Sequence, residues 1–511
     1  MRTPFSRRSV LQAAGAGVLA STAAATVAAG SAGAQEETVG SRAANRVVHY
    51  AIPDGVPTND AVRVRVRPVG GAWKTIGIHL VKLPLIDATT GANRSQNSSM
   101  ATFDFAGTVE VEVTFSRGGV RSARIRPDSY GIAHELRGST VRFTLTEPRN
   151  VVVQGDDEIF DCLHLLTNPV EQDPPAQDDP DVIYFGPGVH THPDRTLTVP
   201  SGKTVYLAGG AVLTSNVIFE GVENARLVGR GVIHGATGGA ILVHDCENVQ
   251  VDGITVVNPR YNTITVAESQ NVTISNLRSF SQQGWGDGID VFCSTGVTID
   301  GCFLRNSDDC IALYTHRWEY YGDTRDITVR NTTLWADVAH PINIGTHGNP
   351  DPDNPEVLEN LVFENIDILD HREPQLLYQG CVAINPGDGN LVRNVRVDGM
   401  RVEDFRWGQL IHMRVTFNPK WNTTAGRGIE NVHIKDLTYT GTHADISLLI
   451  GYDADHLIKD VTFENLVVNG RVLRDSGGKP SWYLAADGVP MFANDHVRNL
   501  RFLTTEEAAA Q

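Results

Sequence analysis

Four aspartates lie within one short stretch in the middle of the sequence. Asp287 and Asp290 belong to the segment GDGID, and the adjacent pair Asp308 and Asp309 follows in NSDDC. If these carboxylates meet in space, their repulsion raises at least one pKa, so one carboxyl group stays protonated while a neighbour stays ionised. Hydrolysis of a glycosidic bond needs such a pair, one acid for the leaving oxygen and one base for a water. An isolated Asp between strands is ordinarily a turn residue, so a chemical role depends on what brings the four together.

The elements that must position these aspartates are short β-like runs that recur from Val182 onward. Each run follows a polar or Gly-containing turn and is rich in β-branched residues. Ten of them are centred on Val205, Ala225, Val249, Val272, Val297, Ile327, Leu361, Val395, Val432 and Val461. A turn–strand–turn–strand unit of this length cannot bury its own apolar face, whereas stacked coils can. The pattern predicts an all-β protein whose residues 182–475 form a right-handed parallel β-helix.

The coil length then predicts how the aspartates meet. Asp287 and the Asp308–Asp309 pair are separated by about one coil. Residues one coil apart stack at the strand spacing of about 4.8 Å. We therefore expect Asp287 beside Asp308 and Asp309, with a turn or bulge that lets both neighbours reach the same groove. Asp290 is expected to brace turn amides or to contact substrate.

Further candidates follow on the next coil. His340 and His347 occur in HPINIGTHG, where either could orient an Asp or bind a sugar hydroxyl. The preceding insertion is aromatic and carries one arginine, and aromatic rings stack on the C–H faces of sugars. For any one aromatic residue, ordinary packing is an equally good interpretation. The predicted substrate-binding residues are Trp285, Asp290, His316, Arg317, Trp318, Tyr320 and His347, with Tyr321 and Trp407 as further aromatic candidates.

The recurrent asparagines Asn248, Asn271, Asn360, Asn394 and Asn431 occupy equivalent positions in the repeat. We interpret them as structural, because Asn tolerates the left-handed conformation at a turn and stacked side-chain amides hydrogen-bond between coils.

The chain before the repeat divides into three parts. Residues 1–34 carry Arg7 and Arg8 ahead of an Ala- and Gly-rich run, the pattern of a twin-arginine export signal, and predict a secreted protein. Residues 47–168 alternate polar and apolar residues between turns, which predicts an N-terminal β-sandwich. Residues 169–181 are a Pro- and Asp-rich linker, and residues 476–511 are expected to form a C-terminal tail without a role.

Charge and cysteine content limit the partners. The formal net charge of −17 argues against nucleic acid, and after signal removal against a membrane, because both require a basic face. The six cysteines are irregularly spaced, so disulfides and buried free thiols remain alternatives. No CxxC pair or HExxH helix indicates a transition metal. We expect no metal and no cofactor, a polysaccharide or oligosaccharide substrate, and a monomer.

The same residues resemble motifs of the inverting, pectin-lyase-like β-helix glycoside hydrolases. Gly286–Asp290 is similar to the NTDGxD motif of family 28, the polygalacturonases and rhamnogalacturonases. Asn306–Ala312 is similar to its NxDDCxA motif, and His340–Gly345 to a reduced GHGxSIG motif. The resemblance, over roughly residues 180–470, implies Asp308 as general acid and Asp287 and Asp309 as holders of the attacking water. His340 would be an auxiliary catalytic residue.

The sequence also departs from family 28. The strand expected to carry an Arg-x-Lys pair for the galacturonate carboxylate reads Cys381–Asn385 and has no cation. An uncharged sugar is therefore favoured, and the preceding β domain resembles family 49, the dextranases and isopullulanases. Two alternatives remain: a polysaccharide lyase, which needs a basic residue and often Ca²⁺, and a β-helix that only binds glycans.

Overall fold

The computed structural model describes residues 45–87, 90–375, 377–475 and 491–510, and these form almost only β-strands. The helical segments of this part are α1 (Thr505–Ala509), capped by Thr504, and the 3-10 turn η1 (Asp128–Tyr130). The predicted export signal lies outside the described residues. Within them, no helix is long and apolar enough to cross a membrane.

The N-terminal strands form two sheets. One contains β1 (Arg46–His49), β4 (His79–Ile86), β5 (Asn93–Ala106), β7 (Ala123–Arg126), β10 (Asn150–Gly155) and β11 (Cys162–Pro169). The other contains β2 (Val62–Pro68), β3 (Lys74–Ile76), β6 (Val109–Phe115), β8 (His134–Arg137) and β9 (Thr140–Leu145). All pairs are antiparallel except β5 with β11. Alternate residues of both sheets, such as Val64, Val111 and Phe103, share one hydrophobic core.

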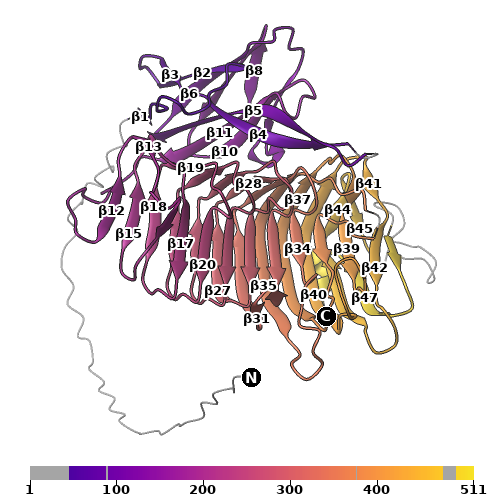
Figure 1. Ribbon diagram of the computed structural model, residues 1–511. Helices are drawn as coiled ribbons and strands as arrows, with labels where there is room; N and C mark the ends of the chain where they lie inside the picture. Colours follow the sequence, from indigo (N-terminus) through magenta and orange to yellow (C-terminus); the bar gives the residue numbers. More distant parts are fainter. Residues whose placement is uncertain (1–44, 88–89, 376, 476–490, 511) are drawn as a thin grey trace, which may run out of the picture. The chain divides into compact units, whose positions relative to one another are not determined.

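The rest of the chain winds into the predicted parallel β-helix (Figure 1). Two strands of each coil enter one large sheet, which is parallel except where β45 turns back on β44. It comprises β12 (Val182–Phe185), β13 (Gly188–His190), β15 (Thr204–Leu207), β16 (Ala211–Leu213), β18 (Arg226–Gly229), β19 (Val232–His234), β21 (Gln250–Asp252), β22 (Thr255–Val257), β24 (Thr273–Ser275), β25 (Arg278–Phe280), β27 (Thr295–Asp300), β28 (Phe303–Asn306), β32 (Thr324–Arg330), β33 (Thr333–Ala336), β35 (Val357–Asp370), β37 (Leu391–Glu403), β40 (Gly428–Thr440), β43 (Ile458–Glu464), β44 (Leu466–Val468), β45 (Arg471–Leu473) and β47 (Val497–Leu503).

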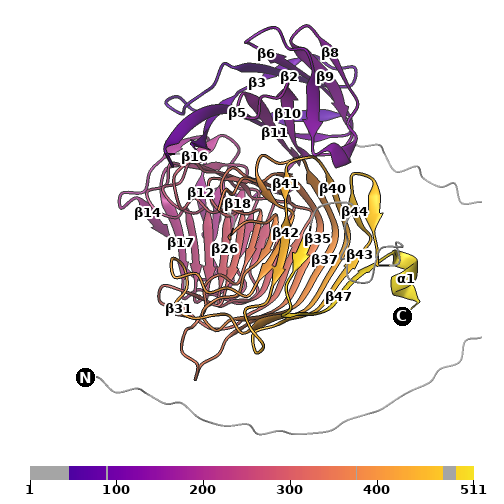
Figure 2. The same cartoon turned by 90° about the vertical axis from the view of Figure 1, so that its right-hand side faces the viewer.

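The third strand of each coil enters a parallel sheet of eleven strands, which positions the candidate site. It comprises β14 (Thr196–Thr198), β17 (Asn216–Glu220), β20 (Ile241–His244), β23 (Ile264–Ala267), β26 (Ile289–Phe292), β29 (Ile311–Tyr314), β34 (Ile342–Ile344), β36 (Val382–Ile384), β39 (Ile411–Arg414), β42 (Ser447–Ile450) and β46 (Met491–Ala493). Figure 2 shows β17, β26 and β42 of this sheet along one side of the coils. Two short pairs complete the fold, β30 (His316–Arg317) with β31 (Tyr320–Tyr321) and β38 (Gly408–Gln409) with β41 (Ala444–Asp445).

Aliphatic ladders hold the coils in register. Through the eleven-stranded sheet, Val217, Ile241, Ile264, Ile289, Ile311, Ile342, Val382 and Ile411 pair successively and point inward. All of them are buried in one core that extends along the coils. A shift of one residue would turn each ladder to solvent, so burial determines the register.

Asparagine ladders form at the turns, as the sequence predicted. Asn248, Asn394 and Asn431 have positive φ angles of 58°, 57° and 54°. Their side-chain amides donate to the asparagine of the preceding coil, at 3.2 Å to Asn224, 3.1 Å to Asn360 and 2.8 Å to Asn394. The structural interpretation of these residues is confirmed.

Two other features differ from expectation or decide between alternatives. β46 pairs with β42, and β47 with β43, so coil pairing continues beyond residue 475, where we expected only a tail. The six cysteines are all free, and five of them are buried, which decides for thiols over disulfides.

A buried ionic network joins the N-terminal strands to the coils. Arg305 donates to Asp337 at 2.8 and 3.2 Å and to His164 of β11 at 3.0 Å. Asp337 also accepts a 2.8 Å bond from Arg406. Apolar residues of both regions, including Leu166 and Trp335, pack around it in one cluster.

We predict that Asp337→Ala lowers the free energy of unfolding by about 3–5 kcal/mol, because it leaves the fully buried guanidinium of Arg305 without its carboxylate. Urea unfolding followed by fluorescence measures the change. The control is Asp398→Ala, which removes an exposed pair with Arg396 and should cost less than about 1 kcal/mol. Equal losses in the two variants would contradict this interpretation of the network.

Candidate active site

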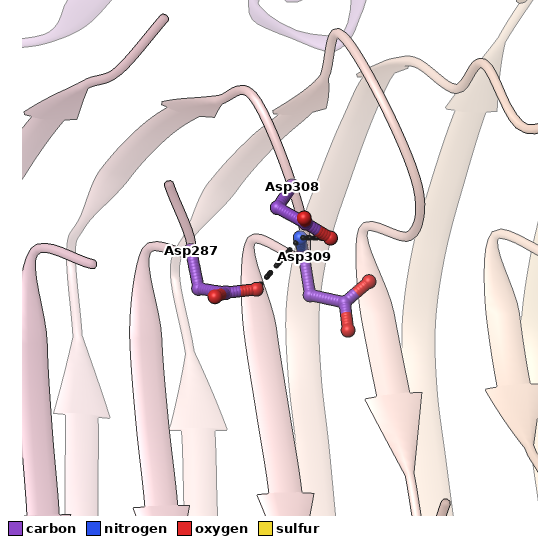
Figure 3. Close-up of side chains that lie close together, drawn as sticks. All are labelled: Asp287, Asp308 and Asp309. Carbon is purple, nitrogen blue, oxygen red and sulfur yellow. Dashed lines mark hydrogen bonds between the residues drawn. The ribbon is translucent and has the colours of Figure 1, made fainter. Parts of the chain in front are cut away.

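Three aspartates meet where two neighbouring coils enter the eleven-stranded sheet (Figure 3). Asp287 precedes β26, and Asp308 and Asp309 precede β29, whose first residue Ile311 pairs with Ile289. The backbone N–H of Asp309 donates to Asp287 Oδ1 and to Asp308 Oδ1, both at 3.1 Å. Carboxylate oxygens from the three residues lie within 4.8 Å of one another. The predicted juxtaposition is therefore present.

The glycines beside Asp287 make this approach possible. A Cβ atom at Gly286 would lie 2.2 Å from the Ser307 hydroxyl, and one at Gly288 would lie 2.3 Å from the carbonyl oxygen of Cys310. Both contacts are to the next coil. The GDG segment is therefore required by the close contact of two coils, and it brings Asp287 to the aspartate pair.

Asp309 is held by four donors from the following segments. Its Oδ1 accepts from the backbone N–H of His340 at 3.0 Å and from His340 Nδ1 at 2.7 Å. Its Oδ2 accepts from Asn343 Nδ2 at 2.7 Å and from the Tyr314 hydroxyl at 3.2 Å. Burial alone would raise the pKa of Asp309, but the His340 charge and these hydrogen bonds outweigh it and lower the pKa. Asp309 is therefore the ionised member of the cluster.

His340 is the cation of this arrangement. It is fully buried, its Nδ1 faces the Asp309 carboxylate, and its Nε2 lies 3.3 Å from the carbonyl oxygen of Tyr378. Both partners are acceptors, so both ring nitrogens donate and the ring is an imidazolium. Burial works against the charge, but Asp309 raises the pKa of His340 above its usual value.

The other three aspartates have raised pKa values. Burial and the Asp309 charge raise the pKa of Asp308 to about 7. The pKa of Asp287 is raised well above its usual value by burial and by Asp290, Asp308 and Asp309. Burial together with Asp309 and Asp308 does the same to Asp290. Because these titrations are coupled, the cluster as a whole retains at least one proton near neutral pH beside an ionised carboxylate.

These groups line a cavity of 1060 Å³, large enough for several sugar units. Of the predicted substrate-binding residues, it brings together Trp285, Asp290, Arg317, Trp318 and His347. Trp285 and Trp318 are exposed aromatic rings at the cavity surface. The pKa of His347 is lowered to about 3 by burial and by Arg317, so His347 is neutral.

Five predicted residues lie elsewhere. His340 is beneath the cavity and acts on it through Asp309. Tyr320 packs with Phe292 and Tyr314, and His316 stacks on Tyr321 with ring centroids 3.8 Å apart. Tyr320, His316 and Tyr321 do not line the cavity, and Trp407 does not line it either.

Asp290 also differs from one expectation, since no hydrogen bond from a turn amide reaches it among the described residues. It is a strand residue of β26 whose side chain lines the cavity. Its Oδ1 is buried and has no hydrogen-bond partner in the described part of the chain.

Several cavity and support residues were not predicted from the sequence. Tyr378, Trp421 and Glu373 line the cavity from later segments, and Asn343 and Tyr314 hold Asp309. Tyr378 stacks on Trp421 at 6.1 Å. Asn343 was detectable, because it follows His340 by three residues on a coil already singled out. Tyr314 is the last residue of β29, whereas Glu373, Tyr378 and Trp421 lie in loops whose path the repeat does not specify.

Two chemical points follow from the geometry. Three carboxylates this close form a donor set that a hard cation such as Ca²⁺ accepts. Their separation is also shorter than the ~6.5–9.5 Å expected of an acid and base with water between them. The cause is the shared Asp309 N–H, which draws Asp287 and Asp308 together.

We predict that His340→Gln destabilises the protein most at low pH. Because the folded pKa of His340 is raised, its contribution is complete below about pH 6.5 and is lost as pH rises through the folded value. The deficit in unfolding free energy should be about 3 kcal/mol near pH 5.5 and should shrink by pH 9. Urea unfolding at several pH values measures it.

The matched control for that experiment is His433→Gln, which removes a partly exposed contact with Glu464 and should change the unfolding free energy by less than about 1 kcal/mol. A His340→Gln deficit that is independent of pH would contradict the imidazolium assignment.

Comparison with known proteins supports the expected resemblance. Residues 234–473 match the model of the family described as Glycosyl hydrolases family 28. The chain is 26% identical over 193 residues to probable endo-xylogalacturonan hydrolase A of Aspergillus fumigatus, covering 33% of this chain and 44% of that protein. It is 25% identical over 232 residues to probable endopolygalacturonase D of Neosartorya fischeri, covering 45% and 43%. The matched region thus spans less than half the length of these relatives.

Among solved structures, Dex49A from Penicillium minioluteum matches with a TM-score of 0.60 at 12% identity, over 89% of this chain and 96% of that one. The protein is therefore a parallel β-helix that resembles family 28 glycosyl hydrolases in sequence, over residues 234–473, and Dex49A in fold.

Proposed function

We propose that this protein is a glycoside hydrolase that cleaves a polysaccharide. The observation that carries the proposal is the pairing of an ionised Asp309, held by the His340 imidazolium, with proton-holding carboxyls in an aromatic-lined cavity. Such an arrangement supplies both an acid and a base at one pH. The match to Glycosyl hydrolases family 28 and the names of the curated relatives support the same activity.

Asp308 is the general acid of this proposal. It lines the cavity, and its carboxyl group is protonated at pH values below about 7. In the reaction its proton passes to the glycosidic oxygen as the bond to the anomeric carbon breaks. Asp309 stays ionised during this step. Its negative charge stabilises the positive charge that develops on the sugar, and it receives no proton from the substrate.

Asp287 and Asp309 hold the attacking water. When the proton of the coupled cluster resides on Asp308, Asp287 is ionised and takes the proton of the water. Both oxygens of Asp309 already accept two hydrogen bonds each, so it contributes mainly negative charge. Asp287 accepts one backbone bond on Oδ1. Oxygen from the water forms the new bond to the anomeric carbon, and the two carboxyl groups exchange protons with solvent afterwards. His340 is a positioning residue, since it acts through Asp309.

We further propose the domain organisation and location suggested by the sequence. Residues 47–168 form a β-sandwich, residues 169–181 a linker, and residues 182–475 the body of a right-handed helix. The shared core of the two N-terminal sheets supports the first assignment. The twin-arginine pattern of residues 1–34 supports export, and the protein is proposed to act outside the cell as a monomer.

We predict that Asp308→Asn reduces kcat/KM by about 10²–10⁴-fold without changing the thermal melting temperature. Reducing-end release on a panel of pectin fragments, dextran, pullulan and other polysaccharides measures it. In the wild type, kcat/KM should fall as pH rises through about 7, because the acid then loses its proton. The control is Asp398→Asn, a partly exposed residue outside the cavity, which should retain full activity.

An active Asp308→Asn variant would contradict the assignment of the acid. Ultraviolet absorbance of an unsaturated product, with loss of activity in chelator, would identify a lyase that uses the carboxylates for Ca²⁺. Binding of a polysaccharide with no release of reducing ends by the wild type would identify a glycan-binding protein.

We also predict inversion at the anomeric carbon. A water held between Asp287 and Asp309 attacks directly, so no glycosyl–enzyme bond forms. Proton NMR during the first turnovers distinguishes the anomer released from the equilibrium mixture. Release of the anomer that the substrate already had would show a retaining reaction, in agreement with the short carboxylate separation, and would assign Asp287 as nucleophile.

A further inference from the structure

The cavity continues from the aspartates along the outer face of the eleven-stranded sheet. Asp290, Thr265, Leu242 and Ile218 pair successively on β26, β23, β20 and β17, and all four line it. At about 4.8 Å per strand, these three steps extend the floor about 14 Å from Asp290. One step is comparable to the length of one sugar unit in a glycan chain. We call Ile218, Leu242 and Thr265 the floor residues.

The floor and its sides carry no charge. The described residues that line this arm of the cavity are Gly91, Asn216, Ile218, Gly239, Ile241, Leu242, Tyr261, Asn262 and Thr265, and none of them is an acidic or basic residue. Tyr261 is exposed and offers a ring to a sugar face. A chain with a carboxylate on every unit would lose hydration here without gaining a counterion.

In the opposite direction the strand column lies beneath other segments, and the cavity is lined there by residues such as Tyr378 and Trp421. Beyond Asp290 the same column continues through Ala312, Asn343, Ala383 and His412, which are fully or almost fully buried. Gln379 covers His412, since its backbone N–H donates to His412 Nδ1 at 3.2 Å. Ile218 and Leu242, by contrast, are half-exposed. The floor of the cavity is therefore accessible on the side of the N-terminal coils.

The N-terminal strands provide one wall of this arm. Gly91, in the connection between β4 and β5, lines the cavity. Asn93 of β5 donates a 2.8 Å bond to the carbonyl oxygen of Gln282, in the segment that leads to Trp285 and Asp287. Asp290, with its buried and unpartnered Oδ1, lies at the start of the floor, where it can accept a hydrogen bond from a sugar hydroxyl.

We propose that the floor residues and Tyr261 bind an uncharged glycan chain, on the N-terminal side of the aspartates. This inference rests on the proposed hydrolase function for the chemistry, but binding by itself tests it. It makes the substrate a neutral polysaccharide and predicts that substrates long enough to cover the floor are cleaved faster than short ones.

The first experiment measures binding with the Asp308→Asn protein by affinity electrophoresis. Gels contain dextran, pullulan, arabinoxylan, unsubstituted arabinan or polygalacturonate, at an ionic strength that suppresses nonspecific charge effects. We expect retardation by at least one neutral polysaccharide and none by polygalacturonate. Retardation by polygalacturonate, or by none of the gels, would overturn the proposal.

The second experiment tests the floor in the otherwise wild-type protein. Leu242→Asp places a carboxylate in the uncharged arm and should weaken retardation, and raise KM for long neutral substrates, by about tenfold or more. Tyr261→Ala should act in the same direction. The matched control is Leu448→Asp, on the same outer column at β42 but outside the cavity, which should change neither quantity.

The two proposals fail differently. If a neutral polysaccharide is bound but never cleaved by the wild type, the hydrolase proposal fails and the floor stands. If the wild type cleaves polysaccharide but Leu242→Asp and Tyr261→Ala bind and cleave it as the wild type does, the floor is overturned and the hydrolase stands. Equal melting temperatures of the variants exclude misfolding as the cause, and Tyr261→Ala, an exposed position, serves if Leu242→Asp does not fold.

Discussion

The parallel register between neighbouring coils is the constraint on which the rest of this structure depends. It is determined by inward ladders of Ile and Val, in which Ile289 and Ile311 are successive members. Because their burial is lost if one strand shifts by a residue, the turn residues just before each strand are also aligned. Asp287 and the Asp308–Asp309 pair occupy those turns, so a hydrophobic ladder brings together carboxylates that would otherwise repel.

The repulsion is balanced locally and incompletely. The His340 imidazolium neutralises the charge of Asp309. The Tyr314 hydroxyl and the Asn343 amide donate hydrogen bonds to the same carboxylate. Among the described residues, Asp287, Asp290 and Asp308 have no comparable set of donors and no adjacent imidazolium, and burial and their mutual repulsion raise their pKa values. An electrostatic cost of this kind is retained where it does chemistry, because a group that holds its proton reluctantly at neutral pH is a good acid. Burial of the aliphatic ladders below the site offsets this electrostatic cost.

The N-terminal strands are part of the same construction. Arg305, Asp337 and His164 form a buried network between them and the coils. Gly91 lines the cavity itself, and Asn93 donates to the carbonyl oxygen of Gln282. The coils supply a regular surface, and the segments that leave it supply its borders. On one side the borders close the sheet around Tyr378 and Trp421, and on the other they leave Leu242 and Ile218 partly open. The direction in which a substrate extends follows from this asymmetry.

The sequence by itself determined the β-helix, the coil that carries the acids, and the meeting of Asp287, Asp308 and Asp309. These follow from local periodicity, since residues one coil apart must stack if each apolar face is to be buried. It also indicated His340, because the histidine occurs at the equivalent turn of the next coil.

Only the tertiary structure decided that His340 is buried behind Asp309, that Asp290 faces the cavity, and that His316 and Tyr320 do not. It alone revealed Glu373, Tyr378 and Trp421 in the walls, and the uncharged floor. The physical reason is that a repeat specifies positions within a coil, whereas inserted loops are placed by long-range contacts that have no period along the chain. The charge and shape of the cavity depend on the coils and on the inserted loops together. The spacing of residues along the chain therefore did not predict them.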